Sequence, residues 1–381
     1  MNKRYDELFR EIGGILREDW AGKDVLGDRL DLRYYNTSVG QAWHDHRLDD
    51  LTFLRYMNEM LAATGDRHLR LAMRPTAEYT PWCCGFFARR YEDSLYVTAL
   101  RGETRLRVGD RIPAINGGSP AEHRARIQKN FFYAETSERE DWNGLLKMAE
   151  HIDVEHLDGS CERLSLARHP LTTPAFRPRV TERKNGVIVD LRNVPDLSDA
   201  ELLDLLPPVC REDTPLSALL DTEFFVNYTR RNCLIKAAAL ADAENAEDYI
   251  AELRDKAGRG FLPESDDDDT VIKGQASGQV IVLTDTWTRD GAEILALAAK
   301  RSGALLMGRA TLGTSEFGGD VSLALDDRYI LTWPTLITRA AQEGKRIPGQ
   351  GIQPEVCIPW MPEECRRDLL LEAAETMLEQ E

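Results

Sequence analysis

Apolar residues in the first part of the chain recur every three or four positions, which is the spacing of one face of an α-helix. One set lies near the N-terminus and comprises Tyr5, Leu8, Phe9, Ile12 and Ile15. A second set comprises Phe53, Met57, Met60 and Leu61. Both sets predict helices, whereas the polar stretch Asn36-Thr37-Ser38 between them predicts a loop. We therefore expect an N-terminal helical domain over residues 1–76.

After two prolines, Pro75 and Pro81, the pattern changes to short segments in which apolar and polar residues alternate. Alternation with a period of two is typical of strands. The predicted strands cover residues 94–98, 108–112 and 163–166. Asn116-Gly117 is a strong signal for a tight turn, and a helix is predicted over residues 140–150. This region predicts a small β domain over residues 77–172.

From about residue 180, short and almost continuous apolar runs alternate with helical patterns. Such runs are typical of parallel strands that are covered on both faces. The predicted strands cover residues 187–191, 280–283 and 304–307, with a hairpin formed by 322–325 and 329–332. The predicted helices cover residues 200–206, 230–241, 246–256, 291–302 and 363–379. The sequence therefore predicts an α/β core over residues 173–381.

Composition narrows the class of protein. The chain has 381 residues, 48 Lys and Arg against 65 Asp and Glu, and a net charge of −17. At about 150 residues per domain, this length predicts two or three domains. The acidic balance argues against nucleic-acid binding, because contact with phosphate needs a basic face. No apolar run approaches the roughly 20 residues that a membrane span needs. The first residues also lack the apolar core of a signal peptide, so we expect a cytoplasmic protein.

Little in the sequence points to a metal or a cofactor, and we expect neither. The seven cysteines are scattered, never in the C-x-x-C spacing of a zinc site, and are expected to be mostly buried and reduced. His44-Asp45-His46 has no evident third ligand. The four aspartates at residues 266–269 are expected to form a solvated loop rather than a cation site.

Three motifs follow one another along the chain. They are Gly65-Asp66-Arg67-His68-Leu69, then Gly109-Asp110-Arg111-Ile112-Pro113-Ala114-Ile115-Asn116-Gly117, and Thr288-Arg289-Asp290-Gly291-Ala292-Glu293 at a strand, turn and helix start. Together they resemble the tail-specific, or C-terminal processing, serine proteases. That family joins a helical domain carrying D-x-H, a PDZ-like domain carrying G-D-x-I-x-x-I-N-G, and an α/β core. The resemblance implies a tail-specific protease or ClpP-crotonase-like core with an inserted PDZ-like β domain. Further matches at residues 187–192, 308–313 and 351–355 extend it over nearly the whole chain.

The chemistry of this family is acyl transfer to a serine in the motif T-x-S-A-x-E, where amides at the helix start stabilise an oxyanion. In this chain the position of that serine holds Asp290. One branch of the family uses a lysine base after T-x-G, where this chain has Thr314, and the other uses a histidine, which His68 matches. The glycine turn that usually follows the first core strand is replaced by Asn193-Val194-Pro195-Asp196, and proline has no N–H to donate.

Several roles for these residues stay open. Asp290 is either a structural N-cap of the following helix or a general base that acts through water with His68. His68 is either a hydrogen-bonded structural histidine or a remnant of the base. Glu293 suits the dipole at the helix start and is expected to be structural. Ser302 and Ser315 lie nearby, but neither is an obvious replacement for the nucleophile.

The resemblance implies a function on polypeptides. By position, the catalytic residues are His68, Asp290 and Gly291. Peptide binding is expected around Gly109, Asp110 and Ile112, through addition of a peptide strand to the small β domain. We expect a serine-peptidase-family protein whose chemistry is impaired because aspartate occupies the nucleophile position.

Two alternatives remain. An active peptidase with a rearranged site would use His68 as its base. A non-catalytic scaffold, or an oligomeric partner of an active paralogue, would use an apolar stripe on the last predicted helix. That stripe comprises Leu369, Leu370, Ala373, Ala374, Met377 and Leu378.

Overall fold

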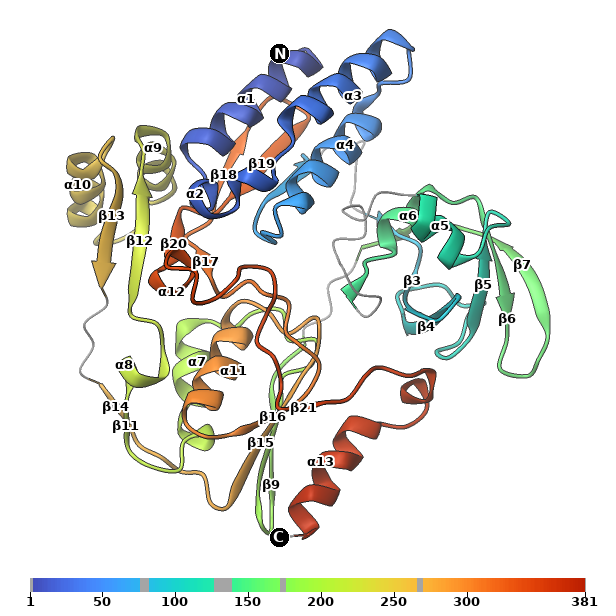
Figure 1. Cartoon of the computed structure of the whole chain (residues 1–381), viewed down its shortest axis with the longest axis vertical. Coiled ribbons are helices and arrows are strands. Elements are labelled where there is room, and N and C mark those ends of the chain that lie inside the picture. Colours follow the sequence, from blue (N-terminus) through green and yellow to red (C-terminus); the bar gives the residue numbers. More distant parts are fainter. Residues whose placement is uncertain (1–2, 76–81, 127–138, 172–175, 266–269, 381) are drawn as a thin grey trace.

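The computed structural model describes residues 3–75, 82–126, 139–171, 176–265 and 270–380. The chain begins with a group of helices, passes through a small antiparallel sheet into an α/β body, and ends in a helix (Figure 1). The four aspartates at residues 266–269 lie outside the described residues. Within the described ranges, none of the helices combines the length and the apolar character needed to cross a bilayer.

The first group of helices confirms the two helices predicted from apolar spacing. The group comprises α1 (Tyr5–Glu18), α2 (Lys23–Leu26), a 3₁₀ turn (Gly27–Arg29), α3 (Leu32–His44) and α4 (Asp50–Ala63). The Asp31 carboxylate accepts a hydrogen bond from the Tyr34 amide at the start of α3. Asp49 accepts in the same way from the Thr52 amide at the start of α4. Both are N-caps, which satisfy amides that have no partner inside the helix.

Helix α3 shows that the loop predicted at Asn36-Thr37-Ser38 was wrong, because this stretch is helical. Tyr35, Val39 and Ala42 are buried on one face of α3, so packing favours the helix over the local preference for a turn. The two hydroxyl groups of the stretch donate to carbonyl oxygens four residues earlier. These bonds let serine and threonine sit inside a helix with their polar groups satisfied.

The main sheet lies in the α/β body and has the strand order β21-β16-β15-β10-β9. Its strands are β9 (Arg179–Arg183), β10 (Gly186–Asp190), β15 (Gln279–Thr284), β16 (Leu305–Gly308) and β21 (Val356–Cys357). Neighbouring strands run parallel, except that β9 forms an antiparallel hairpin with β10. The apolar runs at 187–191, 280–283 and 304–307 are β10, β15 and β16, which confirms the predicted buried strands.

Helices cover both faces of this sheet. Helices α7 (Asp199–Leu205) and α11 (Gly291–Arg301) share one hydrophobic cluster with Val189 and Val282. On the other face, α13 (Leu369–Gln380) packs against Ile281. The apolar stripe predicted on the last helix is therefore part of a core.

The last helix begins later than predicted. The stretch that starts at residue 363 forms a 3₁₀ turn, Pro362–Cys365, and the chain then leaves helical geometry before α13. Asp368 accepts a hydrogen bond from the Leu371 amide at 3.1 Å, and so caps the start of α13.

The small sheet is antiparallel, with the order β3-β4-β5-β6-β7. Its strands are β3 (Phe86–Tyr91), β4 (Ser94–Leu100), β5 (Arg111–Ile115), β6 (His151–Glu155) and β7 (Cys161–Ser165). Associated with it are α5 (Pro120–Arg126), α6 (Asn143–Met148) and the paired strands β2 (Trp82–Cys83) and β8 (His169–Pro170). The sheet has a core of its own, which includes Phe86, Val97 and Trp142.

Two boundaries of this region differ from the prediction. The strand predicted from residue 108 begins only at Arg111, because Gly109 has φ of +96° and lies in a turn. The helix predicted over 140–150 shortens to α6, because the chain enters β6 at His151. The turn predicted at Asn116-Gly117 is confirmed, since both residues have positive φ.

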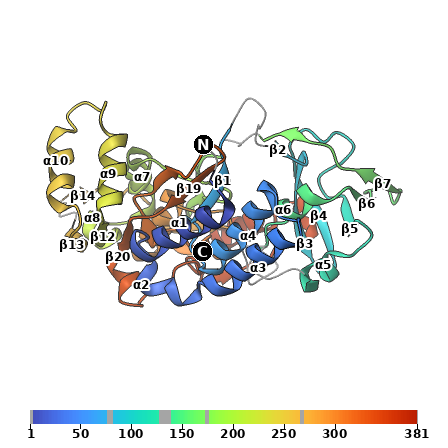
Figure 2. The same ribbon diagram turned by 90° about the horizontal axis from the view of Figure 1, so that it is seen from above.

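The remaining elements form a second sheet and its cover. The sheet has the order β13-β12-β20-β17, made of β12 (Glu223–Tyr228), β13 (Gly260–Ser265), β17 (Phe317–Gly318) and β20 (Leu336–Thr338). Its helices are α9 (Arg230–Ala239), α10 (Glu247–Lys256) and α12 (Arg339–Gln342). Next to it lie α8 (Leu216–Leu219), a 3₁₀ turn (Pro207–Val209), and β11 (Thr214–Pro215) paired with β14 (Val271–Ile272). Seen from above, α9 and α10 lie at one end of the molecule and the small sheet lies at the other (Figure 2).

The N-terminal helices share their core with strands from the end of the chain. Strand β1 (Arg70–Met73) pairs antiparallel with β19 (Tyr329–Trp333), which in turn pairs with β18 (Val321–Ala324). The buried faces of α1 and α4 form one hydrophobic cluster with Leu331 and Trp333. This packing places the segment before β1, which carries His68, against the α/β body.

We predict that Leu331→Ala will loosen α1 and α4 as well as the hairpin that carries it. Leu331 is fully buried in the shared cluster, and truncation of such a leucine costs about 2–5 kcal/mol. Amide hydrogen exchange should then speed up in α1 and α4. Val271→Ala, at an exposed position, should leave exchange in these helices unchanged. Faster exchange confined to β18 and β19 would contradict a shared core.

Candidate functional site

The segment from β15 to α11 forms a sharp strand-to-helix turn, which we call the elbow (residues 285–291). Asp290 stands at its tip, with φ of +49° and ψ of −128°. Residues other than glycine rarely adopt this conformation, which is strained and is typical of a nucleophile held out at such a turn. The elbow therefore holds Asp290 out at a sharp strand-to-helix turn.

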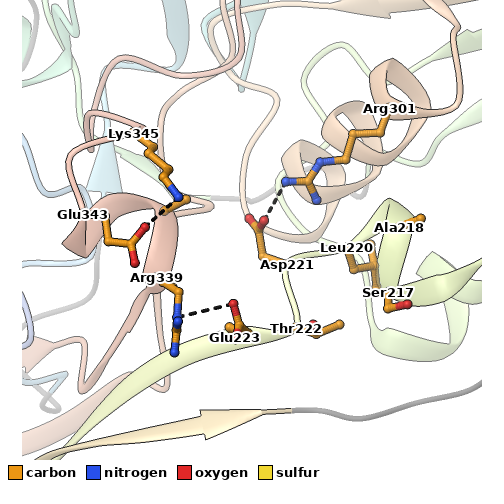
Figure 3. A pocket seen from close by; sticks show the side chains of 11 residues that line it. Ser217, Ala218, Leu220, Asp221, Thr222, Glu223, Arg301, Arg339, Glu343 and Lys345 are labelled. Atoms are coloured by element: carbon orange, nitrogen blue, oxygen red, sulfur yellow. Dashed lines mark hydrogen bonds and ion pairs between the residues drawn. The ribbon is translucent and has the colours of Figure 1, made fainter.

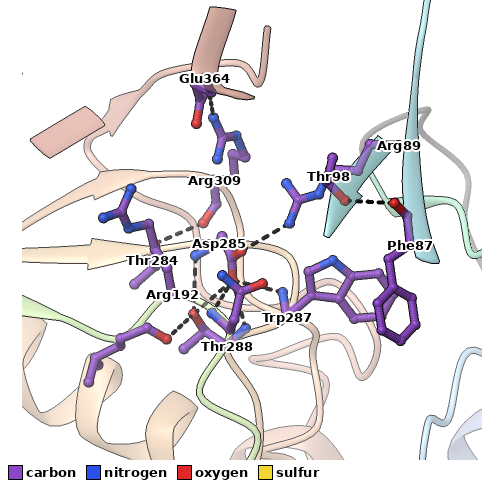
Figure 4. A network of polar contacts seen from close by, with 12 residues as sticks. Phe87, Arg89, Thr98, Arg192, Thr284, Asp285, Trp287, Thr288, Arg309 and Glu364 are labelled. Atoms are coloured by element: carbon purple, nitrogen blue, oxygen red, sulfur yellow. Dashed lines mark hydrogen bonds and ion pairs between the residues drawn. The ribbon is translucent and has the colours of Figure 1, made fainter. Parts of the chain in front are cut away.

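The buried carboxylate of Asp285 holds the elbow in this shape (Figure 4). Its Oδ1 accepts hydrogen bonds from the amides of Trp287 (3.0 Å) and Thr288 (3.1 Å) within the turn. The same atom accepts from the Asn193 amide at 3.0 Å, in the loop that follows β10. Its Oδ2 forms an ion pair with Arg89 Nη2 at 3.1 Å, on β3 of the small sheet. One side chain thus joins the turn, the β10 loop and the small sheet.

Glu293, in the first turn of α11, fixes the loop over residues 311–314. Its fully buried carboxylate accepts hydrogen bonds from the Thr311 hydroxyl (2.6 Å), the Gly313 amide (3.1 Å) and the Thr314 amide (2.8 Å). The Thr314 hydroxyl also donates to Glu293 at 3.0 Å and accepts from the Asp290 amide at 2.7 Å. Glu293 is therefore a structural residue that attaches this loop to the tip of the elbow.

His68 lies directly beside the elbow, so the structure brings together residues that are far apart in the sequence. Its Nε2 is 3.9 Å from Asp290 Oδ1, and it lies 3.0 Å from the carbonyl oxygen of Thr314. Its Nδ1 lies 3.0 Å from Asp320 Oδ1. A carbonyl oxygen only accepts hydrogen bonds, and a carboxylate does the same, so both ring nitrogens donate. This arrangement is that of a charged imidazolium.

Buried charge keeps His68 protonated. Burial lowers the pKa of His68, but the hydrogen bond to Asp320 and the charges of Asp66 and Asp320 outweigh burial and raise the pKa to about 10. Asp66 is itself buried, and it accepts from the Trp20 indole (2.7 Å) and from the His68 amide (2.8 Å). At neutral pH a histidine of this kind can donate protons but is a poor acceptor of them.

Asp290 is not the N-cap that its position suggested. Its side chain makes no cap hydrogen bond to α11, because the positive φ turns it away from the helix amides. The side chain lies instead near two cations, His68 and Arg289 Nη1, the latter at 3.5 Å from Oδ2. The pKa of Asp290 is raised overall, because burial and the nearby charge of Asp196 outweigh the lowering effects of the His68 and Arg289 charges.

The amide at the start of α11 is bonded to Asp196, from the loop that follows β10. Asp196 Oδ1 accepts from the Gly291 amide at 3.2 Å and from the Leu197 amide at 2.8 Å. From Pro195 we expected this loop to lack a donor at the position of the family's glycine turn. The structure shows that Leu197, two residues later, supplies an N–H, and that this N–H and the Gly291 N–H both donate to Asp196 Oδ1.

The residues expected to bind a peptide lie inside the small sheet and its turn. The Asp110 carboxylate is fully buried, and it accepts from the Arg107 amide (2.7 Å) and pairs with His156 Nδ1 (2.9 Å). Ile112 is fully buried in the core of the sheet, and Gly109 forms the turn before β5. These three residues maintain the fold, and a role for them in peptide binding stays a prediction.

The other candidates do not join the elbow. The Ser302 hydroxyl donates to the Val209 carbonyl, and the buried Ser315 hydroxyl donates to Glu316. Among the described residues, no group of three or more His, Cys, Asp or Glu side chains is placed to hold a metal ion. All seven cysteines are free and most are buried, as expected; the buried ones are Cys83, Cys84, Cys210 and Cys233.

A separate hollow of about 250 Å³ lies at the far end of α11 (Figure 3). It is lined by α8, the start of β12 and α12, and its charged side chains pair with one another. The pairs are Arg301 with Asp221 (2.6 Å), Arg339 with Glu223 (3.3 Å), and Lys345 with Glu343 (2.7 Å). The length of α11, about 16 Å at 1.5 Å per residue, separates this hollow from the elbow.

Comparison with known proteins identifies the core. Residues 227–358 match Peptidase family S41. The chain contains a peptidase family S41 domain. This match confirms the predicted resemblance to the tail-specific proteases, and the S41 domain includes the elbow and the loop over residues 311–314. No curated protein sequence matches the chain.

Several solved structures are similar to this chain, and those of CPAF match it with TM-scores above 0.5. Mature CPAF complexed with lactacystin matches at a TM-score of 0.65 and 12% identity, over 99% of this chain and 97% of that chain. A serine-to-alanine mutant of CPAF matches at 0.66 and 12% identity, over 98% and 96%. The photosystem II D1 C-terminal processing protease matches at 0.39 and 13% identity, over 95% and 94%. At 12% identity, the likeness to CPAF shows a shared fold.

Sequence reasoning missed the roles of three residues of this site. Asp320 orients His68, Thr314 bonds both His68 and Asp290, and Asp196 bonds the amide of Gly291. Asp320 and Thr314 meet His68 across more than two hundred residues; the sequence marked Thr314 only as the residue in place of a lysine base, and no local pattern marks Asp320. Asp196 could have been found, because it follows Pro195 at the place of the family's glycine turn.

We predict that the stability that His68 contributes depends on pH. Its pKa is raised from 6.5 to about 10 on folding, so this stability is complete below pH 6.5 and is lost as the pH rises through 10. His68→Asn should therefore destabilise the protein most near pH 6 and least above pH 10, measured by urea unfolding. His44→Asn, at an exposed position, should show no such trend. A ring that titrates near 6.5 by NMR would contradict the imidazolium assignment.

We also predict that Asp290→Gly will stabilise the fold. Glycine adopts positive φ without strain, and relief of such strain is worth about 1–3 kcal/mol. The free energy of unfolding in urea should rise by about 1 kcal/mol. Asp290→Ala removes the same carboxylate but keeps the strain, so it is the matched control. Equal stability of the two variants would show that the backbone angle costs nothing.

Proposed function

We propose that this protein binds polypeptides through an S41-type fold and does not cleave them. Peptidases of this family act on polypeptides, and the S41 domain supports a ligand of that class. One observation carries the proposal of lost catalysis: His68 donates hydrogen bonds from both ring nitrogens beside an elbow whose tip is Asp290. The site thus has neither the serine nor the proton acceptor that acyl transfer requires.

The active-peptidase alternative needs His68 as a base. With a pKa of about 10, roughly one molecule in a thousand would carry neutral His68 at pH 7. Asp290 can attack a peptide carbonyl only by forming an anhydride, which is a poor intermediate for proteolysis. Both points favour binding over turnover.

The small sheet supports peptide binding of the PDZ-like kind. Its edge strands are β3 and β7, and an edge strand can accept a peptide as an added strand through main-chain hydrogen bonds. Arg89 on β3 pairs with Asp285 in the elbow, so a peptide along β3 would lie near the elbow. We propose that Gly109, Asp110 and Ile112 act indirectly, by shaping the turn and core of this sheet.

Several finer assignments belong to the same proposal. We propose that the N-terminal helices and the small sheet correspond to the helical and PDZ-like domains of the tail-specific proteases. A cytoplasmic location and an oligomeric state stay predictions from the sequence. A scaffold role through α13 has less support, because Leu370, Ala374 and Leu378 are buried against the main sheet.

The test measures turnover and binding with one peptide library. Fluorogenic peptides report hydrolysis, and the same sequences with a fluorescent label report binding by polarisation. We expect no hydrolysis above buffer by the wild type, and saturable binding that His68→Ala retains. Turnover that falls at least a hundredfold in His68→Ala but not in His44→Ala would establish an active peptidase. Absence of both turnover and binding would instead support the scaffold.

A further inference from the structure

Asp196 places a carboxylate oxygen where two amides converge. One amide belongs to Gly291, directly after the tip of the elbow, and the other belongs to Leu197, in the loop after β10. An oxyanion hole has this composition: the N–H after the nucleophile and an N–H from a neighbouring loop. In acyl transfer the oxygen that such donors hold belongs to the substrate. Here it belongs to the chain itself.

The backbone of this loop is pressed against the start of α11. A Cβ at Gly291 would lie 2.5 Å from the Leu197 carbonyl oxygen and 2.9 Å from its amide nitrogen, so no larger residue fits without movement. The resemblance places alanine at this position in the family's motif. Gly291 therefore leaves the room that the loop carrying Asp196 needs at the start of α11.

Two further contacts hold the loop in place. The Asn193 amide donates to the buried carboxylate of Asp285, and the Arg289 amide donates to the Val194 carbonyl at 3.4 Å. Asn193 itself has φ of +60°, which turns the chain back toward the elbow. Asp196 is an exposed residue, and its Oδ1 is held by hydrogen bonds from the amides of Leu197 and Gly291. A carboxylate that accepts from amides at a helix start is favoured by charge as well as by geometry.

We propose that Asp196 is a built-in occupant of the oxyanion position, which blocks acyl transfer at the elbow independently of the aspartate at position 290. This inference rests on the proposed function, because it explains loss of catalysis in an S41 domain. It also makes a separate claim: restoring the serine alone leaves the site closed.

The test introduces a serine at position 290, in one variant with Asp196 kept and in another with Asp196 replaced by alanine. The variants are Asp290→Ser, Asp290→Ser with Asp196→Ala, and Asp290→Ser with Asp204→Ala as the matched control, since Asp204 is an exposed acid of α7. The rate of covalent labelling by a fluorophosphonate probe, measured at pH 7 and at pH 10, reports whether the oxyanion position is free. In labelling, the introduced hydroxyl oxygen bonds to phosphorus, the P–F bond breaks and fluoride leaves. The hydroxyl proton passes to neutral His68 and then to water.

We expect the Asp196→Ala double variant to label about 10² to 10³ times faster than Asp290→Ser alone, the usual worth of an oxyanion donor. The Asp204→Ala double variant should label at the rate of Asp290→Ser. Equal rates with and without Asp196, at any level, would overturn the proposal.

A second measurement guards against variants that are misfolded. In the otherwise wild-type protein, Asp196→Ala should speed amide hydrogen exchange at Gly291 and Leu197, whereas Asp204→Ala should not. Unchanged exchange at both amides would also overturn the proposal. The outcome is separable from the proposed function: wild-type peptide hydrolysis would refute lost catalysis, and the labelling ratio would still report whether Asp196 closes the oxyanion position.

Discussion

The buried carboxylate of Asp285 is the contact on which the geometry of the elbow depends. It accepts hydrogen bonds from amides of the turn and of the loop after β10, and it forms an ion pair with Arg89 of the small sheet. A buried charge is costly to leave without partners, so these segments are held together as one arrangement. Asp290 lies in the turn that Asp285 bonds, and Asp196 lies in the loop whose Asn193 amide it bonds. Asp285 thus fixes the positions of the segments around the elbow through its own hydrogen bonds and ion pair.

The site combines a sharp strand-to-helix turn with a protonated histidine and two carboxylates. Acyl transfer needs a nucleophile, a proton acceptor and free donors for an oxyanion. Under our proposals Asp290, a protonated His68 and Asp196 stand at those places; His68 lies near both Asp290 and Asp320, and Asp196 accepts from the Gly291 amide. The small sheet has a core of its own, so its edge strands do not depend on which side chains stand in the elbow.

The sequence predicted those parts of the fold that local periodicity controls. Buried strands such as β10 and β15 and amphipathic helices such as α1 carry patterns that few alternatives satisfy. Helix α3 was missed because the burial of Tyr35 and Val39, which is a tertiary effect, outweighs the turn preference of Asn36-Thr37-Ser38. At the site, motifs located His68 and Asp290. They could not show that hydrogen bonds to Asp320 and Thr314 would keep His68 protonated, because these contacts depend on how distant segments pack.

The core that the N-terminal helices share with the β18–β19 hairpin has a consequence for the order of folding. His68 meets Thr314 and Asp320 only after β1 has paired with β19, a contact between segments more than two hundred residues apart. Contacts of this range are slow to form, because the long loop between them must close first. During synthesis the apolar faces of α1 and α4 must wait for Leu331 and Trp333 to emerge from the ribosome. The nascent chain therefore exposes these helices longest, and the elbow acquires its histidine as one of the last events of folding.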